Sequence, residues 1–180
     1  ANSINNITGQ SACKWLVMEW DGRESSGIFV GNPIGWLLRN VNSSLALFKD
    51  NGIRSFSKVL IAIRPGRRNK RFIDVADKIC RHFGASLTLL NIVSETDSNQ
   101  KIKRTEKSST ELISETKSKS VVKIIKSNNP VEAISEESAS YDLLILGTPE
   151  KDNWISVLFG AGEDRFVKKA ACSVLRLTIK

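Results

Sequence analysis

KVLIAIRPGRRNKRFIDVADKICRHFGASLTLLNIV, residues 58–93, is the stretch of this chain that decides its fold. Residues 58–63 and 86–93 are short apolar runs rich in branched side chains, which is typical of strands buried inside a parallel sheet. The segment 69–83 between them carries apolar side chains at helical spacing, namely Phe72, Val75, Ala76, Ile79 and Cys80. Gly84 follows, and glycine commonly ends a helix. The stretch therefore predicts a strand, a helix and a second strand.

The same alternation continues downstream. Further apolar runs at 121–125, 142–147 and 173–178 predict three more strands. Asn129-Pro130 favours a helix start, because proline at the first helical position loses no needed hydrogen bond, and 161–171 predicts the last helix. The polar segment 94–119 favours only a weakly amphipathic helix. Alternating strands and helices predict a doubly wound α/β domain over 57–180, with a five-stranded parallel sheet and right-handed crossovers.

An internal repeat extends the pattern toward the start of the chain. Residues 12–49 and 141–178 share a strand, a polar loop, an apolar-glycine step, an amphipathic stretch and a second strand. With one gap, Gly31 aligns with Gly160 and Ser44 with Ser173. We therefore expect residues 12–50 to form the carboxyl-terminal half of a second, partial unit of strand, loop, helix and strand, as in a fragment of a tandem array. Residues 1–11 are polar and predict a disordered segment or a linker.

Four stretches together resemble a known family. KVLIAIRPG, IDVADKICRHFGASLTLLNIV, PVEAISEESASYDLLILGT and LFGAGEDRFVKKAACSVLRL are similar to a universal stress protein domain over nearly all of 57–180. The resemblance implies five parallel strands in a Rossmann-like arrangement. Family dimers often pair through their last strands, so we expect the strand near 44–48 to lie beside 173–178, as an internal pseudo-dimer with twofold symmetry. The alternative is that residues 12–50 swap onto a neighbouring chain. Covering that edge would also protect an apolar strand from aggregation.

The resemblance also implies where a ligand would bind. Family members that bind ATP carry G-x2-G-x9-G-[ST] between the fourth strand and the last helix, where glycines and helix amides can approach phosphates. Gly147 and Gly160 stand thirteen apart as this pattern requires, but Glu150 and Ala161 replace its middle glycine and its final hydroxyl residue. An aspartate common after the first strand is replaced here by Arg64-Pro65-Gly66. The candidate ligand-binding residues are Arg64, Pro65, Gly66, Arg67, Gly147, Thr148, Gly160 and Ala161.

These departures favour a chain without a cofactor, with ATP or another adenine nucleotide as the alternative. The earlier copy departs differently, because Gly22 and Gly31 remain while Glu19 stands where Gly147 does. The formal net charge of +8 suggests an anionic partner. The basic turn at 64–71 either binds a nucleotide, a cyclic dinucleotide or lipid head groups, or is a solvated turn. No nucleic-acid reader motif or aromatic platform accompanies the basic residues, so we expect no nucleic acid partner.

No constellation in the sequence predicts catalysis or metal binding. Cys13, Cys80 and Cys172 have no metal spacing and an odd count, which favours free thiols in a reducing cytoplasm. His82 has no cysteine or histidine partner at metal spacing. The carboxylates around the last loop predict solubilising and helix N-terminal charges: Asp142, Glu150, Asp152, Glu163 and Asp164. Four tryptophans gather in the two repeat copies, where Trp20 and Trp154 predict either an interface or a local lid.

The leading functional hypothesis follows from the half unit that precedes a whole one. Tandem domains of this family are found on the cytosolic C-terminus of membrane transporters, and LALFKDNGIRSFSKVLIAIRPG, residues 45–66, resembles the joint between two such units. No apolar run here approaches the ~20 residues that span a bilayer. We therefore expect a cytoplasmic regulatory and dimerisation domain, at the membrane's cytosolic face, that joins a transmembrane transporter domain of its parent chain and is not an enzyme. The alternative is a universal stress protein that binds ATP or a cyclic dinucleotide.

Overall fold

All seven strands of the structure join into one sheet. The computed structural model describes residues 13–20, 41–63, 69–148 and 164–180. Strands β1 (Trp15–Glu19), β2 (Ser44–Lys49), β3 (Lys58–Ala62), β4 (Ser86–Val93), β5 (Ser120–Lys126), β6 (Leu143–Gly147) and β7 (Ser173–Thr178) take the spatial order β1-β2-β7-β6-β3-β4-β5. Every pair is parallel except β2 with β7. The five parallel strands expected over 57–180 are confirmed, and the partial copy extends their sheet instead of folding apart.

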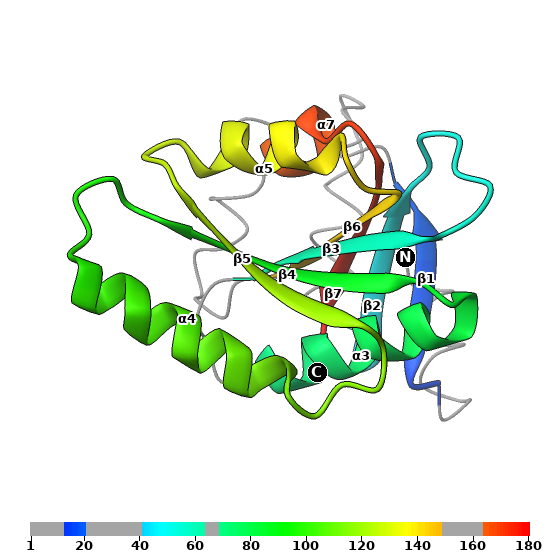
Figure 1. Ribbon diagram of the computed structural model, residues 1–180. Helices are drawn as coiled ribbons and strands as arrows, with labels where there is room; N and C mark the ends of the chain where they lie inside the picture. The colour runs from blue at the N-terminus through cyan, green and yellow to red at the C-terminus, as the bar shows by residue number, and fades with distance from the viewer. Residues whose placement is uncertain (1–12, 21–40, 64–68, 149–163) are drawn as a thin grey trace.

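Helices cover both faces of this sheet (Figure 1). On one face lie α3 (Asn69–Phe83) and α4 (Asn99–Ile113), and on the other lie α5 (Pro130–Ser138) and α7 (Arg165–Lys169). One apolar cluster packs Leu60, Leu144 and Val174 against α5 and α7, and a second packs Val59, Ile61 and Ile145 against α3. The strands therefore alternate between two cores, as a doubly wound sheet requires.

Local sequence explains where the helices begin and end. Gly84 follows α3 with φ +68°, and the amide of Ala85 reaches back to the carbonyl of Cys80 at 2.8 Å, so the predicted glycine stop is confirmed. The side chain of Asn129 caps α5, and Pro130 is its first residue, also as predicted. The expected helix over 161–171 is shorter in the described residues. Asp164 caps α7, and Ala170 takes an extended conformation that leads into β7.

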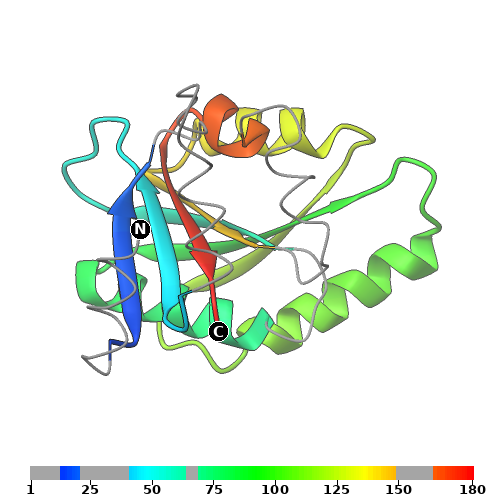
Figure 2. The ribbon, with the colours of Figure 1, turned by 180° about the vertical axis from the view of Figure 1, so that it is seen from behind.

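The two copies of the repeat meet at an antiparallel joint between β2 and β7. Figure 2 shows β1, β2 and β7 side by side as blue, cyan and red ribbons. Because Ser44 corresponds to Ser173, Leu47 three residues later corresponds to Arg176, and these two residues are register partners. A pseudo-twofold axis therefore passes through the pair Leu47 and Arg176. The predicted neighbourhood of 44–48 and 173–178 is confirmed.

Hydrogen bonds repeat across this axis. The amide of Asn51 donates to Ser173 Oγ at 2.9 Å, and the amide of Lys180 donates to Ser44 Oγ at 3.2 Å. The two bonds are counterparts, since Asn51 and Lys180 each stand seven residues after the equivalent serine. The amides of Trp20 and Thr148 likewise reach the carbonyls of Phe48 and Leu177, both at 2.8 Å. The internal pseudo-dimer is thus symmetric down to individual hydrogen bonds.

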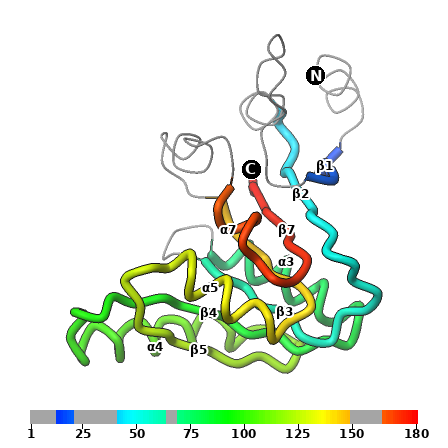
Figure 3. Tube along the Cα trace, turned by 90° about the horizontal axis from the view of Figure 1, so that it is seen from above, coloured from blue at the N-terminus to red at the C-terminus, as the bar shows by residue number. Residues whose placement is uncertain are grey.

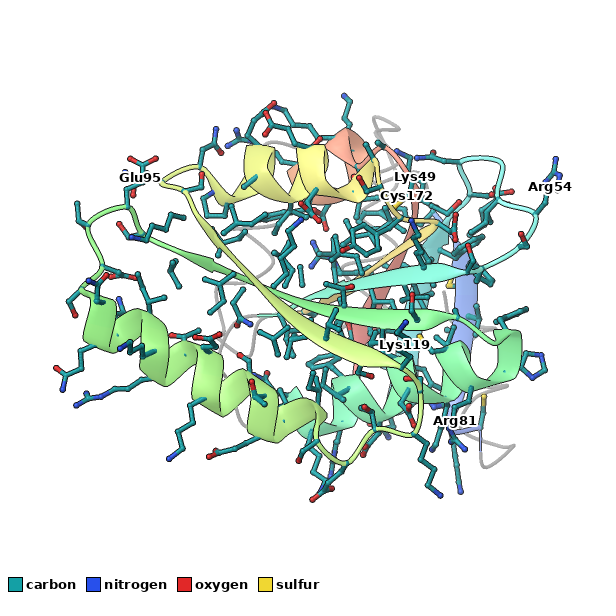
Figure 4. The ribbon with its side chains drawn as sticks, viewed as in Figure 1. Lys49, Arg54, Arg81, Glu95, Lys119 and Cys172 are labelled. Atoms are coloured by element: carbon teal, nitrogen blue, oxygen red, sulfur yellow. The ribbon has the colours of Figure 1, made fainter. Side chains whose placement is uncertain are left out.

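Side chains at the end of β2 and just after it strengthen the joint from one side. Lys49 Nζ donates to the carbonyl of Val167 at 3.0 Å, and Asn51 Nδ2 donates to the carbonyls of Ala170 and Cys172 at 3.3 and 2.8 Å. Figure 4 labels Lys49 and Cys172 in this region near α7. These donors satisfy carbonyls at the end of α7 that the helix leaves unpaired. The first unit therefore holds the last helix of the second.

Candidate functional site

The site that the topology favours lies at the carboxyl ends of β3 and β6. Strand β3 is central, and the chain leaves it through α3 to β4 on one side, while β6 lies on its other side. In an open α/β sheet, ligands bind where successive connections leave in opposite directions. Ile63, Gly147 and Thr148 mark this point in the described residues. The other candidates, Arg64, Pro65, Gly66, Arg67, Gly160 and Ala161, lie outside the described residues, as do Glu150 and the counterpart glycines Gly22 and Gly31.

Gly147 has a packing role at this point. A Cβ atom added there would lie 3.1 Å from two ring carbons of Phe72 on α3 and 3.4 Å from Cγ2 of Ile63. Gly147 is not among the described glycines with positive φ, which are Gly52 and Gly84, so backbone conformation does not demand it. The phenyl ring favours glycine here, because an added methyl group would force the ring to move by a few tenths of an ångström. Phe72 was predicted only as a core residue, and its contact with Gly147 was not foreseen.

Thr148 is tied to β7. Its amide donates to the carbonyl of Leu177 at 2.8 Å, and its hydroxyl lies 2.9 Å from the hydroxyl of Thr178. Both threonine side chains are buried. The contact with Thr178 fixes the orientation of the Thr148 side chain, although a hydroxyl that makes one hydrogen bond can still make another. Of the two described candidates, therefore, one packs against a ring and the other bonds to a neighbouring strand.

A buried ion pair lies behind the same strand ends. Nε and Nη2 of Arg176 donate to Oδ2 of Asp164, the first at 2.8 Å, and Nη1 donates to the carbonyl of Gly147 at 3.1 Å. Asp164 is fully buried and Arg176 is 5% exposed. The other carboxylate oxygen, Oδ1, accepts the amides of Phe166 and Val167 and so caps α7. The pair thus fixes β6, β7 and α7 to one another at the end of the sheet where the candidate site lies.

This network corrects one expectation. Asp164 was predicted as a solubilising or helix N-terminal charge, and only the helix-terminal part is right, because its carboxylate lies in the interior beside Arg176. Asp142 is likewise a structural group, since its Oδ2 accepts the amides of Ser57 and Lys58 and the hydroxyl of Ser57, all at 2.7–2.8 Å. One sequence signal could have revealed the ion pair. Arg176 is a lone charge in the apolar strand SVLRLT, and a charge at such a place needs a partner.

A pocket opens beside the switch point, between α3 and α4. Its volume is about 220 Å³, and its lining includes Ile63, Asn69, Asn91, Arg104 and Ser108. Nδ2 of Asn91 donates to Ser109 Oγ at 2.9 Å in the floor, and Arg104 supplies a cation. Arg104 was not among the candidate residues from the sequence, because nothing in the pattern places α4 over the strand ends. The pocket is small, and its lining combines the apolar side chains of Ile63, Leu89 and Leu112 with polar groups and the cation of Arg104, a mixture that is typical of small-molecule sites.

Two of the three thiols are buried. All three cysteines are free, as expected, and burial raises the pKa of Cys80 and of Cys172 to about 11. Such thiols stay protonated at neutral pH and are poor nucleophiles. No group of three histidine, cysteine or acidic side chains that could hold a metal ion occurs among the residues that the structure describes.

Comparison with known proteins identifies the family. The model of the universal stress protein family matches residues 55–177. The chain belongs to this family. Among curated proteins no match was found. A universal stress protein from Archaeoglobus fulgidus DSM 4304 superposes with a TM-score of 0.70 at 16% identity, over 97% of this chain and 63% of that chain. This chain thus spans less than two thirds of the length of that structure.

Two further universal stress proteins give the same fold. A putative member from Pseudomonas aeruginosa UCBPP-PA14 superposes with a TM-score of 0.63 at 14% identity, over 96% of this chain and 66% of that chain. A universal stress protein in complex with cAMP superposes with a TM-score of 0.55 at 17% identity, over 68% of this chain and 97% of that chain. At these identities the likeness establishes the fold, and what binds here has to be argued from this chain's own residues.

Proposed function

We propose that this chain is a regulatory and pairing module that works by binding, without chemistry of its own, in a membrane transporter. One observation carries the proposal: the mirrored joint between β2 and β7, where Asn51 and Lys180 make counterpart hydrogen bonds. The residues of this joint form a twofold contact between two units of the family. A joint with matched hydrogen bonds on both sides suits a module that transmits a signal through the way its units are arranged.

The residues around the end of β6 have structural roles, which supports a module that binds without phosphate chemistry. Gly147 is occupied by the Phe72 ring, Thr148 by Thr178, and Asp164 by Arg176. The module would work at the cytosolic face of the membrane, and further self-association through paired units would transmit the signal. A ligand would have to bind two arrangements with different affinity for regulation to follow.

The transporter assignment rests on the resemblance of residues 45–66 to the joint of transporter-linked tandem modules. No helix among the described residues is long and apolar enough to cross a membrane. The test begins with the gene: hydrophobic helices encoded upstream of Ala1 support the assignment, and their absence overturns it. Reconstituted in vesicles, the parent should keep basal transport when the module is deleted but lose its response to effectors. A parent that responds equally with and without the module contradicts the regulatory role.

Nucleotide binding is the second candidate, favoured by the pocket that Arg104 lines at the switch point. The universal stress proteins solved with cAMP and with dAMP make these two nucleotides natural probes, and the family's ATP-binding loop pattern adds ATP. Calorimetry on the 180-residue chain decides between the candidates. The leading proposal expects no heat of binding for any probe at millimolar concentration. Saturable binding that Arg104→Ala or Arg64→Ala weakens at least tenfold, while the exposed control Lys107→Ala leaves it unchanged, would favour the nucleotide reading.

A further inference from the structure

Strand β1 ends the sheet and exposes apolar side chains. Within the described residues β1 pairs only with β2 (Figure 3 shows both beyond β7, at the end of the sheet opposite β5). Trp15 is 36% exposed and Val17 is 65% exposed on the face that α3 covers elsewhere. The carbonyl of Lys14 and the amide of Trp20 point to β2. The amides of Val17 and Glu19 therefore point to the open edge, because successive backbone groups alternate along a strand.

The pseudo-twofold axis reveals what this edge corresponds to. Trp15 pairs with Ser44 as Leu143 pairs with Ser173, so β1 is the counterpart of β6. Strand β6 lies between β7 and β3, and its residues Leu143 and Ile145 are 2% and 0% exposed. Trp15 and Val17 occupy the same positions in the first unit. They are core positions whose cover is missing from the described residues.

A groove lies where that cover belongs. It has a volume of about 550 Å³ and runs between α3 and the beginnings of β1 and β2. Arg71, Val75 and Lys78 line it from one side of α3, at spacings that place them on a common helix face, while Lys14 and Trp15 line it from β1. Asp74 is its one acidic lining residue, against the cations Lys14, Arg71, Lys78 and Lys180. The groove is therefore basic at its rim, with apolar side chains at Val75 and Trp15.

We infer that the β1 edge and this groove receive a β-strand parallel to β1 and the amphipathic helix that follows it, from a part of the same chain outside these 180 residues. Across the axis, the strand is the counterpart of β3 and the helix the counterpart of α3. The basic rim calls for acidic residues on the helix face that meets α3. The inference does not depend on the transporter assignment, since any tandem parent would satisfy it.

A second copy of the chain fits the edge less well. The strand that the symmetry asks for is β3, and in this chain β3 already pairs on both sides, with β4 and β6. Two β1 edges meeting about a twofold axis would pair antiparallel and would bring no helix to the groove. The relatives that superpose on 97% and 96% of this chain are longer, since it spans 63% and 66% of them. Additional length of that order is sufficient for the missing strand and helix.

The test compares the 180-residue chain with the full chain that its gene encodes. Val17→Lys should leave the Tm of the short chain within about 2 °C, because the side chain is exposed there, but should lower the unit's Tm in the full chain by about 5 °C or more. Val121→Lys is the matched control: Val121 is 52% exposed on β5, the opposite edge strand, and should be tolerated in both forms. Hydrogen exchange should show slow amides at Val17 and Glu19 only in the full chain.

Three outcomes would overturn the inference. The first is an equal, small effect of Val17→Lys in both forms with fast exchange at Val17 and Glu19. The second is a gene that encodes no strand and helix outside these residues. The third is a dimer of the 180-residue chain that Val17→Lys dissociates, because the occupant of the edge would then be a second copy.

Discussion

At the scale of single residues, Arg176 and Asp164 form the most deeply buried ion pair in the described residues. Both side chains are buried, and the pair links two strands to a helix cap. Removing one member of a buried ion pair strands the other charge in the interior, which costs about 3–5 kcal/mol. Each of the two charges therefore stabilises the fold mainly by neutralising the other.

Arg176→Ala should accordingly lower the free energy of unfolding by about 3–5 kcal/mol, measured by urea denaturation. The matched control is Arg165→Ala, which removes an exposed arginine from α7 and should change it by less than about 0.5 kcal/mol. The double variant Arg176→Leu with Asp164→Asn should recover part of the loss, because no unpaired charge remains and the asparagine still caps α7. Equal effects of Arg176→Ala and Arg165→Ala would contradict the role of the pair.

Asp142 predicts how stability depends on pH. Burial raises the pKa of its carboxyl, but hydrogen bonds from the Ser57 hydroxyl and from the amides of Ser57 and Lys58 outweigh burial and lower the pKa below the ordinary aspartate value. A carboxyl with a lowered folded pKa stabilises the fold above its unfolded pKa and loses that contribution as pH falls through the folded value. Its share of stability should therefore be complete at neutral pH and decline below about pH 4.

Asp142→Asn should destabilise the protein at pH 7 and flatten the decline of the unfolding free energy between about pH 4 and pH 2. Chemical denaturation at a series of pH values measures both effects. Asp74→Asn, a change at an exposed carboxylate on α3, serves as the control. If the acid limb of the variant has the same slope as that of the parent, Asp142 does not contribute as described.

At the scale of elements, α3 is set against the sheet by a ring and a glycine. Gly147→Ala would force the Phe72 ring to move by a few tenths of an ångström, at a cost of about 1–3 kcal/mol for overpacking. Phe72→Leu removes the ring carbons that the new methyl group meets. The cost of Gly147→Ala should therefore be smaller in the Phe72→Leu background, and a double-mutant cycle by denaturation measures the coupling. Strictly additive effects would place the strain elsewhere.

The helices and strands could be predicted from local sequence patterns, but the contacts between side chains far apart in the sequence could not. Apolar runs and caps such as Gly84 and Asn129 predict strands and helices because they act within a few residues. The alignment of Ser44 with Ser173 predicted the β2–β7 joint, since a repeat carries its own symmetry. By contrast, the contact of Phe72 with Gly147 joins residues 75 positions apart in the sequence, and no periodicity encodes it. The pocket at Arg104 was missed for the same reason.

At the scale of the whole molecule, the mirrored serines test whether the two copies share their joint equally. Ser44→Ala and Ser173→Ala each remove the acceptor of one counterpart bond, so each should cost about 0.5–1.5 kcal/mol. Ser173 also lies 3.3 Å from Asp50 Oδ1, which should make its loss the larger one. Ser108→Ala, an exposed position on α4, is the control. Loss at only one of the two serines would show that the joint is held from one side.

The residues on the pseudo-twofold axis illustrate what covalent linkage permits. In an assembly of two identical chains, the residue on the axis faces its own copy, so each substitution there occurs twice. An arginine at this place would oppose another arginine, and their like charges would repel. Here the two copies are encoded separately, and Leu47 faces Arg176, whose charge is neutralised by Asp164 from its own unit. Because both units belong to one chain, the residue at the centre need not be compatible with a copy of itself, and the chain carries the ion pair in one unit alone.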